Sequence, residues 1–337
     1  MSRQRKIPTP AWEQHTGLPG GMSASRARQF AMVGIIGVVV VAIGIIAAGF
    51  LMDWLDERAL PGSTAISVED RKYSVEEMTE RARLFSAETG NTQATLVLPT
   101  ASDAAINEAL LLKFASEKGV EATDEEIKAE YAKLLGITVD DPGFDNLLQQ
   151  EIASLDMSED QYRDYAKGRV LDSKMTTKFT EELPAAVESV HYRQIQVADQ
   201  ATADEIMRQL AEGADFAALA AEHSTDTTSK DAGGDKGWVP RGVLSEAQED
   251  ILFGLDPNEN ALYPSAGGQV FVYQAVERSD SQPIDESFKP TLASSAYSDW
   301  KTEKRESVTV VNNLDSAEGD TEKIRFVIEN AGLMLSQ

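Results

Sequence analysis

The chain has 337 residues, and its 31 Lys and Arg against 56 Asp and Glu give a formal net charge of −25. A body this acidic repels a phosphate backbone, which argues against nucleic-acid binding. There is no cysteine, which excludes disulfides, thiol catalysis and thiolate metal sites. Only three histidines are present, His15, His191 and His223, too few to favour a zinc site. We therefore expect no metal and no cofactor.

Residues 30–52 form a run without a charged side chain, long enough to span a bilayer as a helix. Basic residues dominate residues 1–28, a segment rich in Pro, Gly and Ser that we expect to be a disordered cytoplasmic tail. The positive-inside rule then places the N-terminus in the cytoplasm and the rest of the protein outside. A cleaved signal peptide is the alternative, but its apolar region is normally shorter, about 7–15 residues. The sequence thus predicts a single-pass anchor over residues 29–52 in the cell membrane.

Helical signals dominate residues 64–184. Ser74, Thr123 and Ser158 are each followed three residues later by Glu or Gln, the pattern of a capping box at the start of a helix. Apolar spacing predicts a further helix over residues 105–118. We therefore expect a helical domain over this range.

A different pattern occupies residues 188–280. Strand-like residues 190–197 come first, and helical segments follow. A glycine-rich turn then leads into Trp238, and residues 270–276 have the character of a closing strand. This order is typical of a small α+β domain with an antiparallel sheet.

The run His191-Tyr-Arg-Gln-Ile-Gln-Val, the later Ser224-Thr-Asp, and Gly233-Gly-Asp-Lys-Gly-Trp resemble the parvulin family of peptidyl-prolyl cis-trans isomerases. The helical domain resembles the N-terminal domain of chaperones of the SurA, PpiD and PrsA type. In those proteins a helix after the isomerase domain completes the chaperone domain, and residues 285–337 are expected to do so here. The fold class expected is therefore α+β, with one transmembrane helix, a helical chaperone-like domain and an inserted parvulin domain.

The resemblance implies a set of site residues in the parvulin domain. His191, Asp226 and Ser265 fall where the family has its first histidine, a loop acid and a threonine that bonds the paired histidines, so they are expected to be catalytic. The substrate-binding positions are Leu244, Gln248, Lys236 and Trp238. Two of the catalytic candidates also have plain structural interpretations, His191 as a bonded strand histidine and Asp226 as a turn cap.

Three positions depart from the family pattern. Lys236, Gln248 and Val270 stand where the family has a pocket leucine, a pocket phenylalanine and a second histidine. Lysine and glutamine keep a prolyl pocket wet, so the departures predict reduced or lost activity. Gln248 has a structural interpretation as well, because it completes a capping box with Ser245.

The resemblance implies a membrane-anchored, extracytoplasmic foldase that assists exported or membrane proteins and binds unfolded or extended, proline-containing polypeptides. Two alternatives stay open: a parvulin-like chaperone without catalysis, and an accessory subunit of a larger membrane complex. The predicted partners are polypeptide clients, the lipid bilayer through residues 30–52 and, for the last alternative, other membrane subunits.

Overall fold

The computed structural model describes residues 59–335 of the protein. Within this range no helix is both long and apolar enough to cross a membrane. The predicted anchor at residues 30–52 lies outside the described residues.

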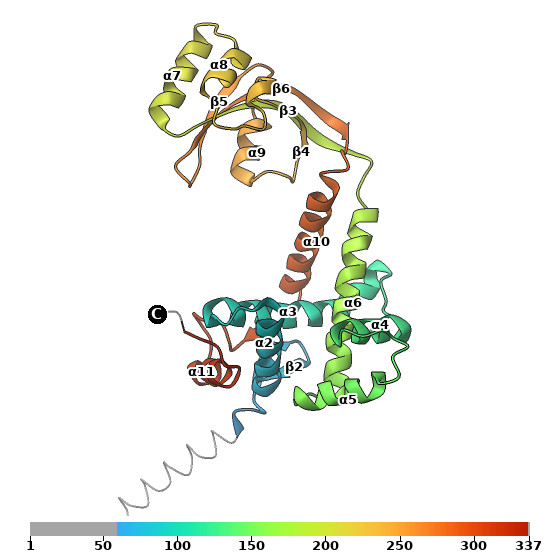
Figure 1. Ribbon diagram of the computed structural model, residues 1–337. Helices are drawn as coiled ribbons and strands as arrows, with labels where there is room; N and C mark the ends of the chain where they lie inside the picture. The colour runs from blue at the N-terminus through green and yellow to red at the C-terminus, as the bar shows by residue number, and fades with distance from the viewer. Residues whose placement is uncertain (1–58, 336–337) are drawn as a thin grey trace, which may run out of the picture. The chain divides into compact units, whose positions relative to one another are not determined.

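The described residues form an α+β fold with two antiparallel sheets (Figure 1). The smaller sheet has the strand order β2-β1-β7, and the larger has the order β4-β3-β6-β5. The strands are β1 (Thr64–Val68), β2 (Arg71–Ser74), β3 (Ala186–Val197), β4 (Asp235–Pro240), β5 (Asn260–Pro264), β6 (Val270–Pro283) and β7 (Val310–Asn312).

Helices surround the smaller sheet and continue beyond it. They are α2 (Val75–Thr89), α3 (Ala94–Phe114), α4 (Asp124–Leu134), α5 (Phe144–Ser154), α6 (Glu159–Glu181), α10 (Lys289–Glu306) and α11 (Thr321–Asn330). One apolar cluster joins α2, α3 and α11 to β1, and a second joins α3, α6 and α10. Residues near the start and near the end of the described range therefore pack together in the same apolar clusters.

Two pairings show how the late segments rejoin the early ones. Strand β7 pairs with β1, with Val311 opposite Ser67. Helix α10 packs on α6 through an aromatic stack, in which the Phe179 and Tyr297 ring centroids lie 5.3 Å apart. The larger sheet and its helices thus form a module between two halves of one helical domain.

The helix starts follow local side-chain chemistry. The predicted capping boxes at Thr123 and Ser158 are both formed, at the starts of α4 and α6. At α2, the Ser74 hydroxyl accepts from the Glu77 amide at 3.0 Å, but the Glu77 carboxylate accepts from Arg81 instead of returning to Ser74. Only half of that predicted box is therefore present.

Three features of the helical domain differ from the expectation. Helix α3 begins at Ala94, well before the predicted start at residue 105, and its predicted last four residues form a 3-10 turn. A short strand is expected over residues 308–311, and β7 (Val310–Asn312) is found there, but helix α5 and strands β1 and β2 were not predicted. Short strands and a helix without a side-chain cap carry little periodic signal, because tertiary packing stabilises them.

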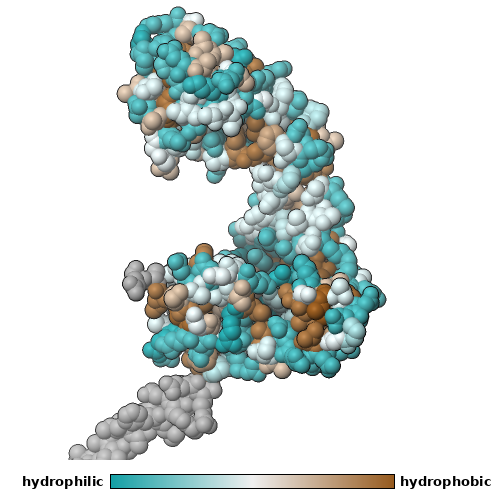
Figure 2. Space-filling model, viewed as in Figure 1, coloured by the Kyte–Doolittle hydropathy of each residue, from teal (hydrophilic) through white to brown (hydrophobic). Residues whose placement is uncertain are grey.

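The module consists of the larger sheet with α7 (Gln200–Ala211), α8 (Phe216–His223) and α9 (Glu246–Leu252). Helices α7 and α8 cover one face and α9 packs on the other (Figure 1). Figure 2 shows hydrophobic surface gathered near α9. The candidate site is built on this second face.

Candidate functional site

The site begins with the side chains that β3 sends to the α9 face of its sheet. Tyr192 packs in the cluster below α9, whereas Ile195 and Val197 pack under α7 and α8. Gln194 pairs with Tyr273 of β6 across the ladder. A buried glutamine on this face needs a hydrogen-bond partner, since an unpaired buried amide costs about 1–3 kcal/mol.

Asp226 is that partner. Its Oδ2 accepts from Gln194 Nε2 at 2.8 Å and from the Ser229 hydroxyl at 2.7 Å. Its Oδ1 accepts from the Thr228 amide at 2.9 Å and the Thr228 hydroxyl at 2.6 Å. Lys236 on β4 adds an ion pair, with Nζ 3.3 Å from Oδ2. The acid predicted from the loop is therefore the centre of a polar cluster.

The cluster determines the charge of Asp226. Partial burial pushes the pKa of its carboxyl upward, but the donors on Thr228, Ser229 and Gln194 outweigh burial and hold that pKa well below its ordinary range. Asp226 is therefore ionised at every pH near neutrality. It is suited to orient groups around it rather than to transfer a proton.

A close approach of two backbone segments fixes the cluster. The Gln194 amide donates to the Gly234 carbonyl at 2.8 Å. A Cβ on Gly234 would lie 2.4 Å from the Gln194 carbonyl oxygen, and the residue has φ +80°. Only glycine fits here, which explains the Gly233-Gly234 pair in the sequence.

His191 lies apart from this cluster. Its Nε2 is 2.7 Å from Asp235 Oδ1, and its ring lies beside Trp238, which is opposite it in the β3–β4 ladder. Partial burial raises the pKa of the Asp235 carboxyl, but hydrogen bonds from the Gly237 amide and His191 lower it by more. The pKa of Asp235 is therefore below its ordinary value. The structure thus joins His191 to Asp235 and to the Trp238 ring, and it joins Gln194, not His191, to Asp226.

The predicted pocket residues of the α9 segment do lie on the site face. Leu244 packs in the cluster with Tyr192 and Tyr273. Gln248 completes the predicted capping box with Ser245, and its Nε2 also donates to the Tyr273 hydroxyl at 2.8 Å. The Gln248 amide is therefore committed to two structural partners.

Ser265 and Val270 are placed differently from the expectation. Ser265 lies in the β5–β6 turn, where its hydroxyl donates to the Gln269 carbonyl at 2.9 Å. Val270 is 4 % exposed and packs with Val197 under α7 and α8, on the face opposite Gln194. The proposed match of Val270 to a pocket histidine therefore fails geometrically, because its side chain is on the wrong face of the sheet.

Sequence reasoning missed Gln194, Tyr192 and Tyr273 as site residues. Tyr192 and Tyr273 meet edge to face with ring centroids 5.7 Å apart, and burial raises the pKa of Tyr273 to about 12. Gln194 alternates with Tyr192 on one face of the strand, but Gln196 is on the same face, so the pattern indicates a buried glutamine only weakly. The pairing of β3 with β4 and with β6 is irregular next to His191. Such a shift of one residue moves the following side chains to the other face of the sheet, so the face of Gln194 could not be predicted by simple alternation from His191.

These features define a small α+β module with an apolar, aromatic face and one ionised acid, held by donors, at its edge. Residues 175–278 match the family model of the PPIC-type PPIase domain, so the protein contains a parvulin-type domain and the predicted resemblance is confirmed.

Among curated proteins, the foldase protein PrsA of Caldanaerobacter subterraneus subsp. tengcongensis is 32% identical over 158 residues, covering 47% of this chain and 49% of that protein. The foldase protein PrsA of Exiguobacterium sibiricum is 31% identical, covering 41% of this chain and 47% of its own length. The periplasmic chaperone PpiD of Haemophilus ducreyi is 39% identical over 69 residues, 20% of this chain and 11% of that protein. The chain thus spans about half the length of the PrsA relatives it matches.

Two solved structures that align with the chain do so with low TM-scores. The PrsA peptidylprolyl isomerase of Bacillus anthracis aligns with a TM-score of 0.35 at 17% identity, covering 69% of this chain and 98% of that one. The parvulin of Nitrosopumilus maritimus aligns with a TM-score of 0.25 at 26% identity, covering 28% of this chain and all of that one.

Proposed function

We propose that this protein is a peptidyl-prolyl cis-trans isomerase and foldase of the PrsA type, with slow catalysis, that acts on extended, proline-containing segments of polypeptide. The observation that carries the proposal is the match of residues 175–278 to the PPIC-type domain, together with Asp226 on the site face. We also propose the domain limits given above, anchoring through residues 30–52 and an extracytoplasmic location. Extracytoplasmic function is supported by the name of the PpiD relative, a periplasmic chaperone.

The reaction asks for little covalent chemistry. Rotation about an X-Pro bond is opposed by amide resonance, with a barrier of about 18–20 kcal/mol. A protein lowers this barrier if it binds the twisted amide better than the planar one. In this proposal Leu244 and the aromatic side chains of the site face hold the prolyl ring.

The polar side chains of the site explain why we propose slow catalysis. Lys236 and Gln194 are engaged with Asp226, and Gln248 is engaged with Tyr273. These groups keep water near the prolyl ring, so less of its binding free energy is available to the twisted state. The same observation supports the second candidate function, a chaperone that binds extended polypeptides without catalysis.

Restoring the apolar pocket tests the proposal. The double variant Lys236→Leu with Gln248→Phe should raise the isomerisation rate of an X-Pro peptide by about tenfold, equal to about 1.4 kcal/mol in the barrier. Lys174→Leu is the control for loss of a lysine, since Lys174 lies on α6 of the helical domain and pairs with Glu126 of α4. A double variant no faster than the wild type, in a protein that still folds, would contradict the assignment of this pocket.

A further inference from the structure

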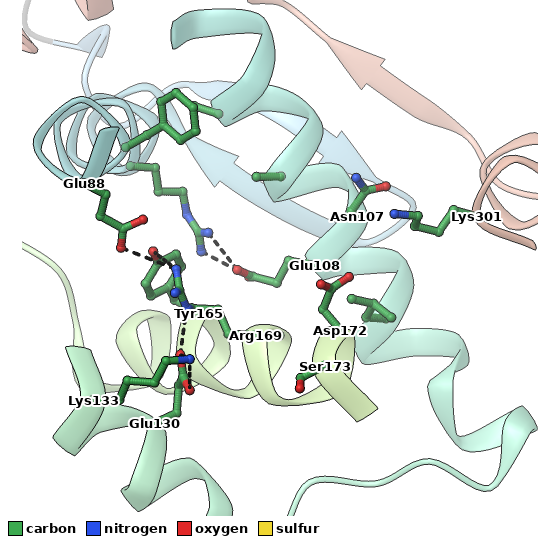
Figure 3. Close-up of a pocket in the computed structure, with 16 residues that line it drawn as sticks. Glu88, Asn107, Glu108, Glu130, Lys133, Tyr165, Arg169, Asp172, Ser173 and Lys301 are labelled. Atoms are coloured by element: carbon green, nitrogen blue, oxygen red, sulfur yellow. Dashed lines mark hydrogen bonds and ion pairs between the residues drawn. The ribbon is translucent and has the colours of Figure 1, made fainter. Parts of the chain in front are cut away.

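A cavity lies in the helical domain, outside the residues that match the PPIC-type domain. Its volume is about 610 Å³, and it is lined by side chains of α2, α3, α4, α6 and α10 (Figure 3). Pockets of roughly 300–1,000 Å³ are typical of sites for small ligands. This cavity can therefore hold a small ligand or a short part of a bound polypeptide, but not a folded partner.

One end of the cavity is already neutralised by its own residues. Arg81 and Glu108 are 5 % and 6 % exposed and bond through Nη1 and Oε2 at 2.7 Å. Arg169 bonds Glu130 at 2.8 Å. The Tyr165 ring lies between the two guanidinium groups, with their carbon atoms 5.3 and 5.7 Å from its centroid. This end is rigid and offers no free charge to a ligand.

The other end has a cation without a carboxylate. Lys301 of α10 lies over the Tyr297 ring, with Nζ 4.3 Å from the centroid, and has no ion-pair partner among residues 59–335. Figure 3 shows Lys301 and Asn107 extending toward one another. Asp172, which also lines the cavity, accepts from the Tyr297 hydroxyl at 2.7 Å. Lys301 and Asn107 are therefore available as donors.

Four apolar side chains also line the cavity: Phe85, Ala101, Ala104 and Leu111. Ala101 and Leu111 are buried, whereas Ala104 is exposed and Phe85 is half-buried. Ala104 lies one turn from Asn107 on α3, so it is the apolar residue nearest to that donor along the helix. The lining also holds four carboxylates, which disfavour a multiply charged phosphate but allow one further carboxylate beside Lys301.

We propose that this cavity binds a polypeptide segment in which a carboxylate lies next to a bulky apolar side chain. The carboxylate binds Lys301 and Asn107, and the apolar side chain packs against Ala104 and Phe85. The carboxylate comes from an acidic side chain or from the C-terminus of the bound polypeptide. This site lies outside the isomerase domain, and binding here does not require isomerisation.

Titration of labelled peptides against the full-length protein tests the proposal. Three peptides share one phenylalanine: the first has a neighbouring glutamate and an amidated end, the second has glutamine and an amidated end, and the third has glutamine and a free C-terminus. The glutamate peptide, the free-acid peptide or both should bind about fivefold more tightly than the amidated glutamine peptide. Equal affinity for all three would overturn the proposal, and the difference between the first and third identifies the source of the carboxylate.

Variants locate the binding. Lys301→Glu should remove the preference for the carboxylate, and Lys301→Arg should retain it. Lys72→Glu makes the same charge change at an exposed lysine of β2 and should alter affinity by less than about twofold. If Lys301→Glu and Lys72→Glu weaken binding equally, the site is not at Lys301. A preserved preference in a protein without isomerase activity would separate this site from the function proposed above.

Discussion

The buried ion cluster of α2 and α3 allows a sharp prediction about stability. Arg81 makes four bonds to two carboxylates: two to Glu108, at 2.7 and 3.1 Å, and two to Glu77, at 3.1 and 3.0 Å. Replacing Arg81 by methionine leaves the buried Glu77 without its cation, and it leaves the buried Glu108 with only the longer ion pair to Arg71, at 3.7 Å. Loss of one partner from such a cluster costs about 3–5 kcal/mol. We expect Arg81→Met to lower the free energy of unfolding of the helical domain by that amount.

A double variant separates the cost of the stranded charge from the cost of lost packing. In Arg81→Met with Glu108→Met, only Glu77 keeps its charge, and it still accepts from Gln161 at 2.9 Å. The double variant should therefore recover at least about 1–2 kcal/mol relative to Arg81→Met alone, because a pair of apolar residues avoids the buried charge. Urea unfolding, monitored by hydrogen exchange of the α3 and α6 backbone amides, measures the change in unfolding free energy of the single variant and of the double variant. An Arg81→Met protein within about 1 kcal/mol of the wild type would refute the reasoning.

Three further predictions concern the parvulin-type module. Gly234→Ala should destabilise it by at least about 2 kcal/mol, since the new Cβ meets the Gln194 carbonyl and φ is +80°; a thermal unfolding midpoint equal to that of the wild type would contradict this. Val270→His should cost about 2–3 kcal/mol without raising the isomerisation rate, because Val270 is buried in an apolar cluster on the face opposite the site; a faster rate would show that the faces are assigned wrongly. Because the folded-state pKa of Asp226 is lowered, its contribution to stability is present above the unfolded pKa of about 4 and is lost as the pH falls below that value. Asp226→Asn should therefore flatten the fall in stability between about pH 4 and pH 2, and acid unfolding curves of identical slope would count against the cluster.

Local chemistry made parts of the fold predictable from the sequence. The starts of α4, α6 and α9 were located correctly because a hydroxyl and a Glu or Gln three residues later satisfy each other within one turn. The α2 start was predicted only in part, because the buried Arg81 competes for the Glu77 carboxylate. That competition comes from tertiary packing, which no local pattern records.

The site was harder to predict than the fold because strand register decides which side chains meet. Asp226 could be found from its loop pattern, and the structure shows what holds it. Gln194 was missed and Val270 was misplaced for the same reason, since an offset along a strand can move a side chain to the other face. Whether the resulting site catalyses isomerisation depends on the hydration of its pocket, which residue types alone do not give.

The central claim is that this module binds an X-Pro segment on its α9 face and speeds its isomerisation. Exchange NMR on a short proline peptide with the full-length protein measures both events, because uncatalysed exchange takes tens to hundreds of seconds. Our account predicts faster cis-trans exchange with the wild type. It also predicts chemical-shift changes at Gln194, Leu244 and Tyr273 on the α9 face, and none at the residues packed under α7 and α8 on the opposite face. Exchange at the uncatalysed rate with no shift changes on the α9 face would contradict it.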